Sequence, residues 1–279
     1  MAAMPPPFRL IITPYLNTRA FVHHGAPAGG ELVALPPRQA GPAIARGNAI
    51  AGIVPVGALD EFDDELELLG HYGIACPGAA RSVLFFSGPP FEALDGDARL
   101  RLTSESRSSV RLLYLLLAAR GRGMPRRAGP QDAIDGELVI GDSALLRAGR
   151  ANETLPHVVD LAERWRAMTG LPMVFARWVV RRDAPSALRA RLLDWLAAYA
   201  RDEARLRERA AIHDGARAGL DPQRARAYLA GIRTVLGTNE LRGQRRYLDE
   251  LARHRCADFA PAAPRAARAA ELPLARVIS

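Results

Sequence analysis

Residues 8–19 read FRLIITPYLNTR, and this sequence gives the first indication of the fold. Its apolar first half ends at Pro14, which predicts a short buried β-strand. The polar residues that follow then occupy a strand-to-helix loop, where open α/β sheets contact their ligands. A second apolar run, Ile50–Val56, predicts another buried strand. Short helices are expected at Pro42–Arg46 and Ala58–Leu69, and the resulting order β-α-β-α favours a parallel sheet.

The rest of the chain predicts a second lobe. Strands are expected at Tyr72–Cys76, Ser82–Ser87, Leu138–Ile140 and Met173–Val180, and helices at Ser106–Ala119, Asp142–Ala148, Val158–Thr169, Ser186–Arg209 and Pro222–Leu236. We therefore expect a two-lobed α/β fold with a ligand cleft between the lobes. Residues 1–90 form the first lobe and 91–177 an inserted second lobe. Helices over 178–256 return to the first lobe, and 257–279 form a loosely ordered tail.

The composition excludes several classes of function. All 38 residues counted as Lys or Arg are Arg, so Schiff-base enzymes, pyridoxal-phosphate enzymes and P-loop lysines are excluded, since each needs an ε-amine. The formal net charge of +8 would suit a nucleic acid, but the arginines are scattered without interleaved aromatic residues, so we expect no nucleic-acid partner. Cys76 and Cys256 match no metal or redox spacing, and we expect them to be inert.

The N-terminus and the motifs of the chain give no sign of export, of a membrane span or of a cofactor site. Pro5, Pro6 and Pro7 stand where a secretory signal would need an apolar stretch of about 7–15 residues. No apolar run approaches the roughly 18 residues that a membrane helix needs. The chain has no Gly-rich dinucleotide loop, nucleophile elbow or zinc-type histidine pair. We expect a cytoplasmic protein with no cofactor, no metal and no membrane partner.

Polar residues at the ends of predicted elements are the candidates for chemistry. Asn17 both donates and accepts hydrogen bonds, and Arg19 offers a planar fork for a carboxylate, although Asn17 could simply cap a turn. The segment 106–109, Ser-Arg-Ser-Ser, opens the Leu-rich helix, where free N–H groups attract an anion or Ser106 is an ordinary N-cap. Ser82 lies at a strand start and Gly141-Asp142 at a strand end.

Five segments together resemble the chorismate dehydratase family of menaquinone biosynthesis. They are YLNTR (15–19), IVPVGAL (53–59), SRSSV (106–110), IGDSAL (140–145) and TGLPMVFARW (169–178), in the family's order. The resemblance spans about residues 8–250. The chain departs from the common pattern at Ala20, Ile50, Ser108 and Met173, which affects the fit of the substrate more than the reaction.

The resemblance implies the fold of type 2 periplasmic binding proteins. It also implies a hydro-lyase of the futalosine pathway that converts chorismate to 3-[(1-carboxyvinyl)oxy]benzoate and water. In this scheme Asn17 and Ser82 are catalytic, and the dianionic substrate is bound by Thr18, Arg19, Ser106, Arg107, Ser108, Ser109, Gly141 and Asp142. The proton acceptor stays open between Glu105, Asp142 and the substrate's own side-chain carboxylate.

Three other functions stay open at this stage. The same fold serves non-catalytic solute-binding proteins, here for a small carboxylate. It also serves a related menaquinone-pathway dihydroxynaphthoate synthase, which relies on a histidine that has no counterpart here. A basic interaction protein is the third alternative, and it would need no ordered cleft.

Overall fold

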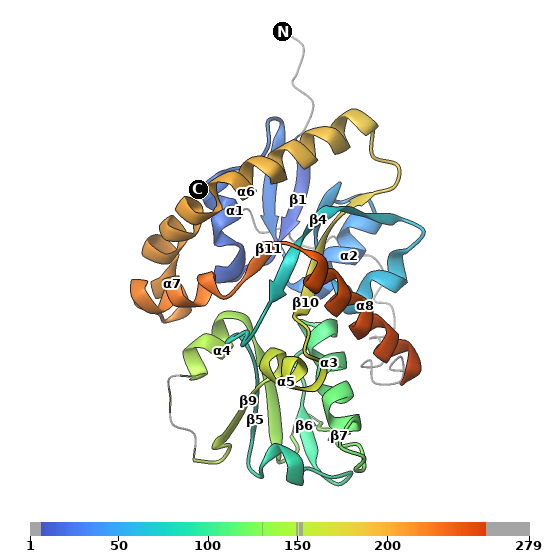
Figure 1. The fold of residues 1–279 in the computed structure, drawn as a ribbon, viewed down its shortest axis with the longest axis vertical. Helices are drawn as coiled ribbons and strands as arrows, with labels where there is room; N and C mark the ends of the chain where they lie inside the picture. Colours follow the sequence, from blue (N-terminus) through green and yellow to red (C-terminus); the bar gives the residue numbers. More distant parts are fainter. Residues whose placement is uncertain (1–6, 130, 149, 151–152, 255–279) are drawn as a thin grey trace.

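Two β-sheets form the two lobes of the molecule (Figure 1). The structure is a computed structural model, and it describes residues 7–129, 131–148, 150 and 153–254. One sheet has six strands in the order β11-β4-β10-β3-β1-β2, and the other has five in the order β7-β6-β8-β5-β9. Helices accompany both sheets, so each lobe is an α/β unit, as the order of elements predicts.

The six-stranded sheet and its helices form the first lobe. Its strands are β1 (Phe8–Ile12), β2 (Gly30–Ala34), β3 (Ala51–Pro55), β4 (Leu66–Cys76), β10 (Met173–Arg181) and β11 (Arg233–Val235). Its helices are α1 (Arg19–His24), α2 (Pro37–Ala45), α6 (Ser186–Asp214), α7 (Pro222–Ala230) and α8 (Thr238–Arg253), with 3-10 turns η1 (Leu16–Thr18), η2 (Val56–Phe62) and η4 (Gly215–Ala218). β1 pairs in parallel with β2 and β3, whereas β10 runs antiparallel to β3 and β4, so the sheet is mixed.

The five-stranded sheet forms the second lobe. Its strands are β5 (Val83–Ser87), β6 (Arg99–Arg101), β7 (Arg126–Arg127), β8 (Gly136–Ile140) and β9 (His157–Asp160). Its helices are α3 (Arg107–Ala118), α4 (Gly141–Ala148) and α5 (Leu161–Thr169), with the 3-10 turn η3 (Phe91–Ala93). None of the helices in the described part of the chain is both long and apolar enough to cross a membrane.

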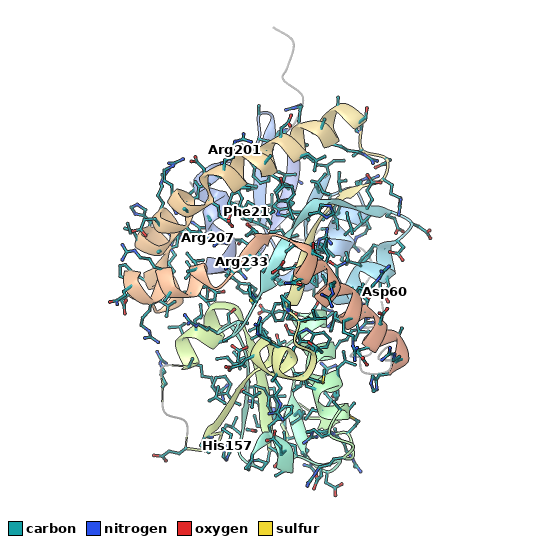
Figure 2. The ribbon with its side chains drawn as sticks, viewed as in Figure 1. Phe21, Asp60, His157, Arg201, Arg207 and Arg233 are labelled. Carbon is teal, nitrogen blue, oxygen red and sulfur yellow. The ribbon has the colours of Figure 1, made fainter. Side chains whose placement is uncertain are left out.

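Apolar packing explains why the helices sit where they do. In the first lobe Phe21 lies beneath α6 (Figure 2), stacks on Tyr199 with ring centroids 3.9 Å apart and meets Trp178 edge-on at 5.3 Å. A separate core cluster runs through α3 and α5 of the second lobe and includes Tyr247 of α8. The lobes therefore share buried apolar contacts along one side, which stabilise their relative position.

The chain crosses between the lobes earlier than the expected boundaries at 90 and 177. β4 ends at Cys76 in the first sheet, and β5 begins at Val83 in the second. The return crossing lies between Thr169 and Met173, because β10 pairs with β3 and β4 from its first residues. The apolar run 83–87 pairs instead with β8 and β9, which no local pattern reveals.

Three expected helices contain strands. Within Ala58–Leu69, the 3-10 turn ends at Phe62 and β4 begins at Leu66. The first residues of Val158–Thr169 belong to β9. The range Pro222–Leu236 ends in the edge strand β11. In each case a ladder with a distant strand overrides the local helical pattern. The expected tail over 257–279 lies outside the described residues.

Candidate functional site

A small cavity lies between the lobes, beyond the carboxyl ends of β1 and β3. Both lobes contribute to its lining, which includes Gly141 and the polar residues Thr13, Tyr15, Asn17, Ser82, Ser106, Ser109 and Tyr228. Apolar residues complete it, among them Ile53, Ile140 and Phe175. The volume is about 70 Å³, whereas small-molecule sites usually hold about 300–1,000 Å³. The cavity of the described arrangement is therefore smaller than a usual ligand site.

The loop after β1 carries Asn17 into this cavity. The Thr13 hydroxyl donates to Asn17 Oδ1 at 3.3 Å, and the buried Thr18 hydroxyl donates to the Thr13 carbonyl at 2.6 Å. Because Oδ1 accepts from Thr13, the amide N–H₂ group is the end of Asn17 that can donate to a ligand. Asp142 of the second lobe accepts from the Leu16 backbone N–H at 2.9 Å, so both lobes hold this loop.

Ser82 stands where the chain enters the second lobe. Its side chain is buried, and the Tyr228 hydroxyl donates to Ser82 Oγ at 3.0 Å. Burial raises the pKa of Tyr228 well above its ordinary value, so its hydroxyl stays protonated. The Ser82 carbonyl accepts from the Gly141 N–H at 2.8 Å. Gly141 has φ of 64°, and a Cβ there would lie 2.6 Å from the Tyr15 ring.

The N-terminus of α3 faces the same cavity. Ser106 is its N-cap and accepts from the Ser109 N–H at 3.2 Å, while the two hydroxyls lie 2.9 Å apart. Ser108 points elsewhere: its Oγ accepts from the Gly57 N–H at 2.8 Å and donates to the Phe175 carbonyl at 3.2 Å. The end of a 12-residue helix carries a partial positive charge, which here meets the cavity.

No described lining residue of the cavity carries a formal charge at neutral pH. Burial raises the pKa of the Cys76 thiol to about 12, and Asp160 adds to the effect. Burial also raises the pKa of Tyr15, as does the hydrogen bond that its hydroxyl donates to Glu105 at 2.9 Å. The cavity can therefore bind an anion only through hydroxyls, the amide and helix N–H groups.

The expected site residues divide into two groups. Asn17, Ser82, Ser106, Ser109 and Gly141 line the cavity, whereas Thr18, Arg19, Arg107, Ser108 and Asp142 do not. Arg19 Nε donates to the buried carboxylate of Asp214 at 2.7 Å, and Arg107 forms an ion pair with Glu61. Both arginines thus pair with carboxylates of the protein in the described arrangement.

Several lining residues, among them the polar Thr13 and Tyr228, were not among the predicted site residues. Thr13 directly follows β1 and lies two residues before the matched segment 15–19, so its position after the first strand was a usable signal. Tyr228 lies 146 positions from Ser82 on a helix with no distinctive motif, and no local pattern indicates it. Cys76 also lines the cavity, but its raised pKa agrees with the inert thiol that the sequence predicts.

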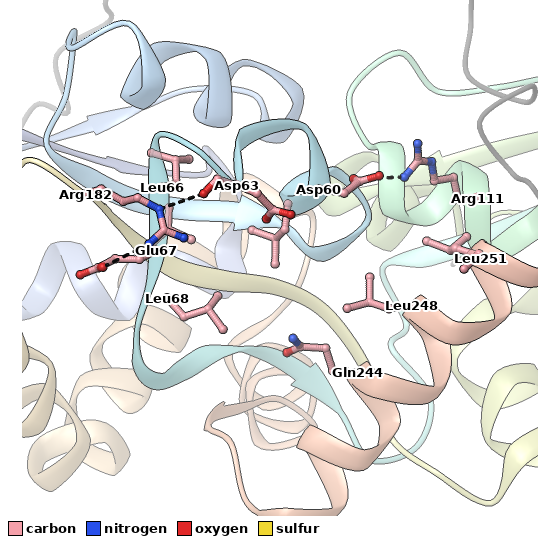
Figure 3. A pocket seen from close by; sticks show the side chains of 13 residues that line it. Asp60, Asp63, Leu66, Glu67, Leu68, Arg111, Arg182, Gln244, Leu248 and Leu251 are labelled. Atoms are coloured by element: carbon pink, nitrogen blue, oxygen red, sulfur yellow. Dashed lines mark hydrogen bonds and ion pairs between the residues drawn. The ribbon is translucent and has the colours of Figure 1, made fainter.

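A wider groove of about 770 Å³ lies between η2, β4 and α8 (Figure 3). Leucines 59, 66, 68, 248 and 251 give it an apolar wall, and Arg111 pairs with Asp60 at its rim, 3.6 Å apart. None of the expected site residues lines this groove. The interlobe cavity, though smaller, is where the matched segments meet.

Comparisons with known proteins agree with this geometry. The model of a menaquinone biosynthesis family matches residues 8–253. A curated chorismate dehydratase from Thermus thermophilus is 32% identical over 198 residues, which are 64% of this chain and 72% of the relative.

Solved structures show the fold. An Archaeoglobus fulgidus protein matches with a TM-score of 0.64 at 16% identity, over 89% of this chain and 97% of that one. The periplasmic aliphatic sulphonate binding protein SsuA from Escherichia coli matches with a TM-score of 0.61 at 16% identity, over 90% and 94% of the two chains. A Candida albicans protein described as having the generic periplasmic binding protein fold matches with a TM-score of 0.53 at 9% identity, over 89% and 95%. The fold is that of periplasmic binding proteins, and the match over residues 8–253 shows that the chain belongs to the menaquinone biosynthesis family.

Proposed function

We propose that the protein is a chorismate dehydratase, a hydro-lyase that converts chorismate to 3-[(1-carboxyvinyl)oxy]benzoate and water in the futalosine route to menaquinone. One observation carries the proposal. The segments 15–19, 106–110 and 140–145, which are remote in sequence, each contribute lining to a single uncharged cavity between the lobes. The name of the Thermus thermophilus relative supports the same reaction.

The donors around the cavity suit a substrate with two carboxylates. The first turns of α3 and α4 both begin at the cavity, and Ser106 and Ser109 add hydroxyls there. Helix N-termini hold anions without any charged side chain, because their N–H groups lack partners within the helix. Because the volume is only about 70 Å³, the lobes must part to admit chorismate.

The proposed reaction removes the hydrogen from the ring carbon that bears the enolpyruvyl ether. The electron pair of that C–H bond moves into an extended enolate through the ring double bond to the ring carboxylate. The C–O bond at the neighbouring carbon then breaks, and the hydroxide leaves with the proton as water. Fixed donors at the ring carboxylate stabilise the charge that grows there, and Ser82 and the α3 end suit this role.

Asn17 is placed to assist the leaving group. Its Oδ1 is engaged by Thr13 at 3.3 Å, so its N–H₂ group can donate to the departing oxygen. The described lining contains no His, Asp or Glu. The substrate's own side-chain carboxylate is therefore the proton acceptor that we propose, and its proximity to the C–H bond replaces a protein base. Such a biosynthetic enzyme acts in the cytoplasm.

Incubation of the purified protein with chorismate tests the proposal. We expect chorismate to disappear as aromatic ¹H NMR signals and a product lighter by one water molecule appear together. Binding of chorismate without consumption would contradict the proposal and would instead favour a solute-binding protein. The Asn17→Asp variant, handled identically, controls for spontaneous decay of chorismate.

A further inference from the structure

We propose that Asp160 is a positioning residue for Ser82, a role that rests on the proposed function. Asp160 lies at the junction of β9 and α5, opposite Leu84 in the ladder between β9 and β5. Its carboxylate contacts residues 77–82, which connect β4 to β5 and are called the crossing segment.

The Asp160 carboxylate binds this segment with both oxygens. Oδ1 accepts from the Ala80 N–H at 3.0 Å, and Oδ2 accepts from the Arg81 N–H at 2.6 Å. Oδ1 also accepts from the Ala162 and Glu163 N–H groups at 3.0 and 3.2 Å, which caps α5. One side chain thus joins the start of α5 to the crossing segment between the lobes, and only a carboxylate can accept from both sides in this way.

The backbone of the crossing segment needs such support. Among the described residues, Arg81 is the one non-glycine residue with positive φ, at 61°. This left-handed conformation is unfavourable for a residue with a side chain, because Cβ crowds the following carbonyl oxygen. Glycine would adopt it freely. Residues in such conformations persist where surrounding contacts hold them, and here the two bonds to Asp160 do so.

The turn at Arg81 positions the next residue, Ser82. Ser82 lines the cavity, its Oγ accepts from Tyr228 at 3.0 Å, and its carbonyl accepts from the Gly141 N–H at 2.8 Å. The direction of the chain at Arg81 therefore sets both the Ser82 hydroxyl and the start of α4. Loss of the left-handed turn would move the hydroxyl away from the substrate.

The Asp160→Asn variant removes one of the two bonds to the crossing segment. The amide oxygen, in the place of Oδ1, still caps α5 and accepts from the Ala80 N–H, because Asn is itself a good N-cap. The NH₂ group then faces the Arg81 N–H, donor against donor, and the left-handed turn is destabilised. We expect kcat for chorismate to fall about a hundredfold, as for a misplaced catalytic group, with a much smaller change in KM. Loss of capping alone would lower Tm and leave kcat near the wild-type value.

Arg81→Gly in the Asp160→Asn background provides the rescue. Glycine forms the turn without help, so the double variant should recover about tenfold in kcat over Asp160→Asn, a substantial part of the loss. Asp135→Asn is the matched control. Asp135 also binds a backbone N–H, that of Arg99 at 2.7 Å, but it precedes β8 at the end remote from the cavity, and we expect wild-type kcat.

Crystal structures of the wild-type protein and Asp160→Asn complete the test. We expect residue 81 to leave the left-handed region and the distance between Ser82 Oγ and Tyr228 Oη to increase. An unchanged turn would overturn the proposal, and so would wild-type kcat despite an altered turn, or a loss of kcat that Arg81→Gly does not relieve. If the wild-type protein did not consume chorismate, the proposed function would be overturned, and with it the role of Asp160 in catalysis. The crystal structures would still decide whether Asp160 holds the turn.

Discussion

Asn17 is the residue on which the proposed dehydration depends most. Replacing it by Asp substitutes an acceptor-only anion for an amide that donates, beside a dianionic substrate. We expect turnover of chorismate to fall by about 10²–10³-fold, as when a single transition-state donor is lost. Because Asn17 lies in a loop, Tm should change little. Parallel turnover and thermal unfolding measurements check this.

Asn48→Asp makes the same change in charge at an exposed position and serves as the control. It should retain wild-type turnover. A folded Asn17→Asp protein with near-normal turnover would remove Asn17 from the mechanism and leave it as a turn residue.

Cys76 makes stability depend on alkaline pH. Its pKa is about 12 in the folded protein against an ordinary value of 9.0, so between these values the unfolded chain binds fewer protons. The free energy of unfolding must then fall as pH rises from about 9 to about 12, and it keeps the full contribution of the thiol below that range. At pH 10.5 the loss from this thiol is about 2 kcal/mol.

Urea unfolding of wild type and Cys76→Ala at pH 7 and pH 10.5 measures this contribution. Between the two pH values, the free energy of unfolding of the variant should fall by about 2 kcal/mol less than that of the wild type. A packing defect of the variant at pH 7 does not affect this difference. Equal losses would show that the thiol titrates normally in the folded state.

At single positions, the sequence predicted which residues come together where the signal was local. Asn17 follows a strand, Ser106 opens a helix, and both line the cavity. Arg19 is different, because its partner Asp214 lies 195 positions away, and an arginine suited to a substrate carboxylate is equally suited to a protein one. Tyr228 carried no local signal at all.

Helix α3 is the element that links sequence pattern to anion binding. Its Leu-rich body is buried among α5, β10 and α8, and this fixes the direction of its N-terminus toward the cavity. Ser106→Ala removes both the cap and a hydroxyl at that end. We expect a loss of about 0.5–2 kcal/mol in stability and a rise of about tenfold in KM for chorismate, as for a lost hydrogen bond to a charged group.

Ser106→Thr keeps the hydroxyl and should retain both properties. Denaturant unfolding and steady-state kinetics on the two variants distinguish capping from substrate binding. If Ser106→Ala lost stability with no change in KM, Ser106 would be a cap alone.

Among the elements, continuous apolar runs and the Leu-rich helix were predicted well, whereas several strands without an apolar run of their own were absorbed into predicted helices. The helix expected at Ser106–Ala119 is α3 and the strand expected at Met173–Val180 is β10, each within a residue or so. The strand β9 was absorbed into a predicted helix, because its four residues, which end at the capping Asp160, are too few to show a period of their own. Its strand character comes from pairing with β5, which is a tertiary contact.

For the whole molecule, the two-lobed arrangement followed from the order of elements, while the positions of the crossings did not. The cavity of about 70 Å³ is smaller than a site that holds a ligand of this size, so the lobes must move apart to bind it. Addition of 3-[(1-carboxyvinyl)oxy]benzoate should therefore raise the radius of gyration measured by small-angle X-ray scattering. Asn17→Asp, which opposes carboxylate binding, should show a weaker response at the same concentration. An identical scattering profile with bound product would contradict this motion.

We expect the interlobe cavity to hold a dicarboxylate on helix N-termini without a charged side chain. A crystal structure of the protein with 3-[(1-carboxyvinyl)oxy]benzoate is the decisive measurement. One carboxylate should lie at the N-terminus of α3, beside Ser106 and Ser109, with Asn17 and Ser82 in contact with the ligand. A product molecule bound in the wider groove of Figure 3, or a carboxylate held by Arg19 released from Asp214, would contradict it.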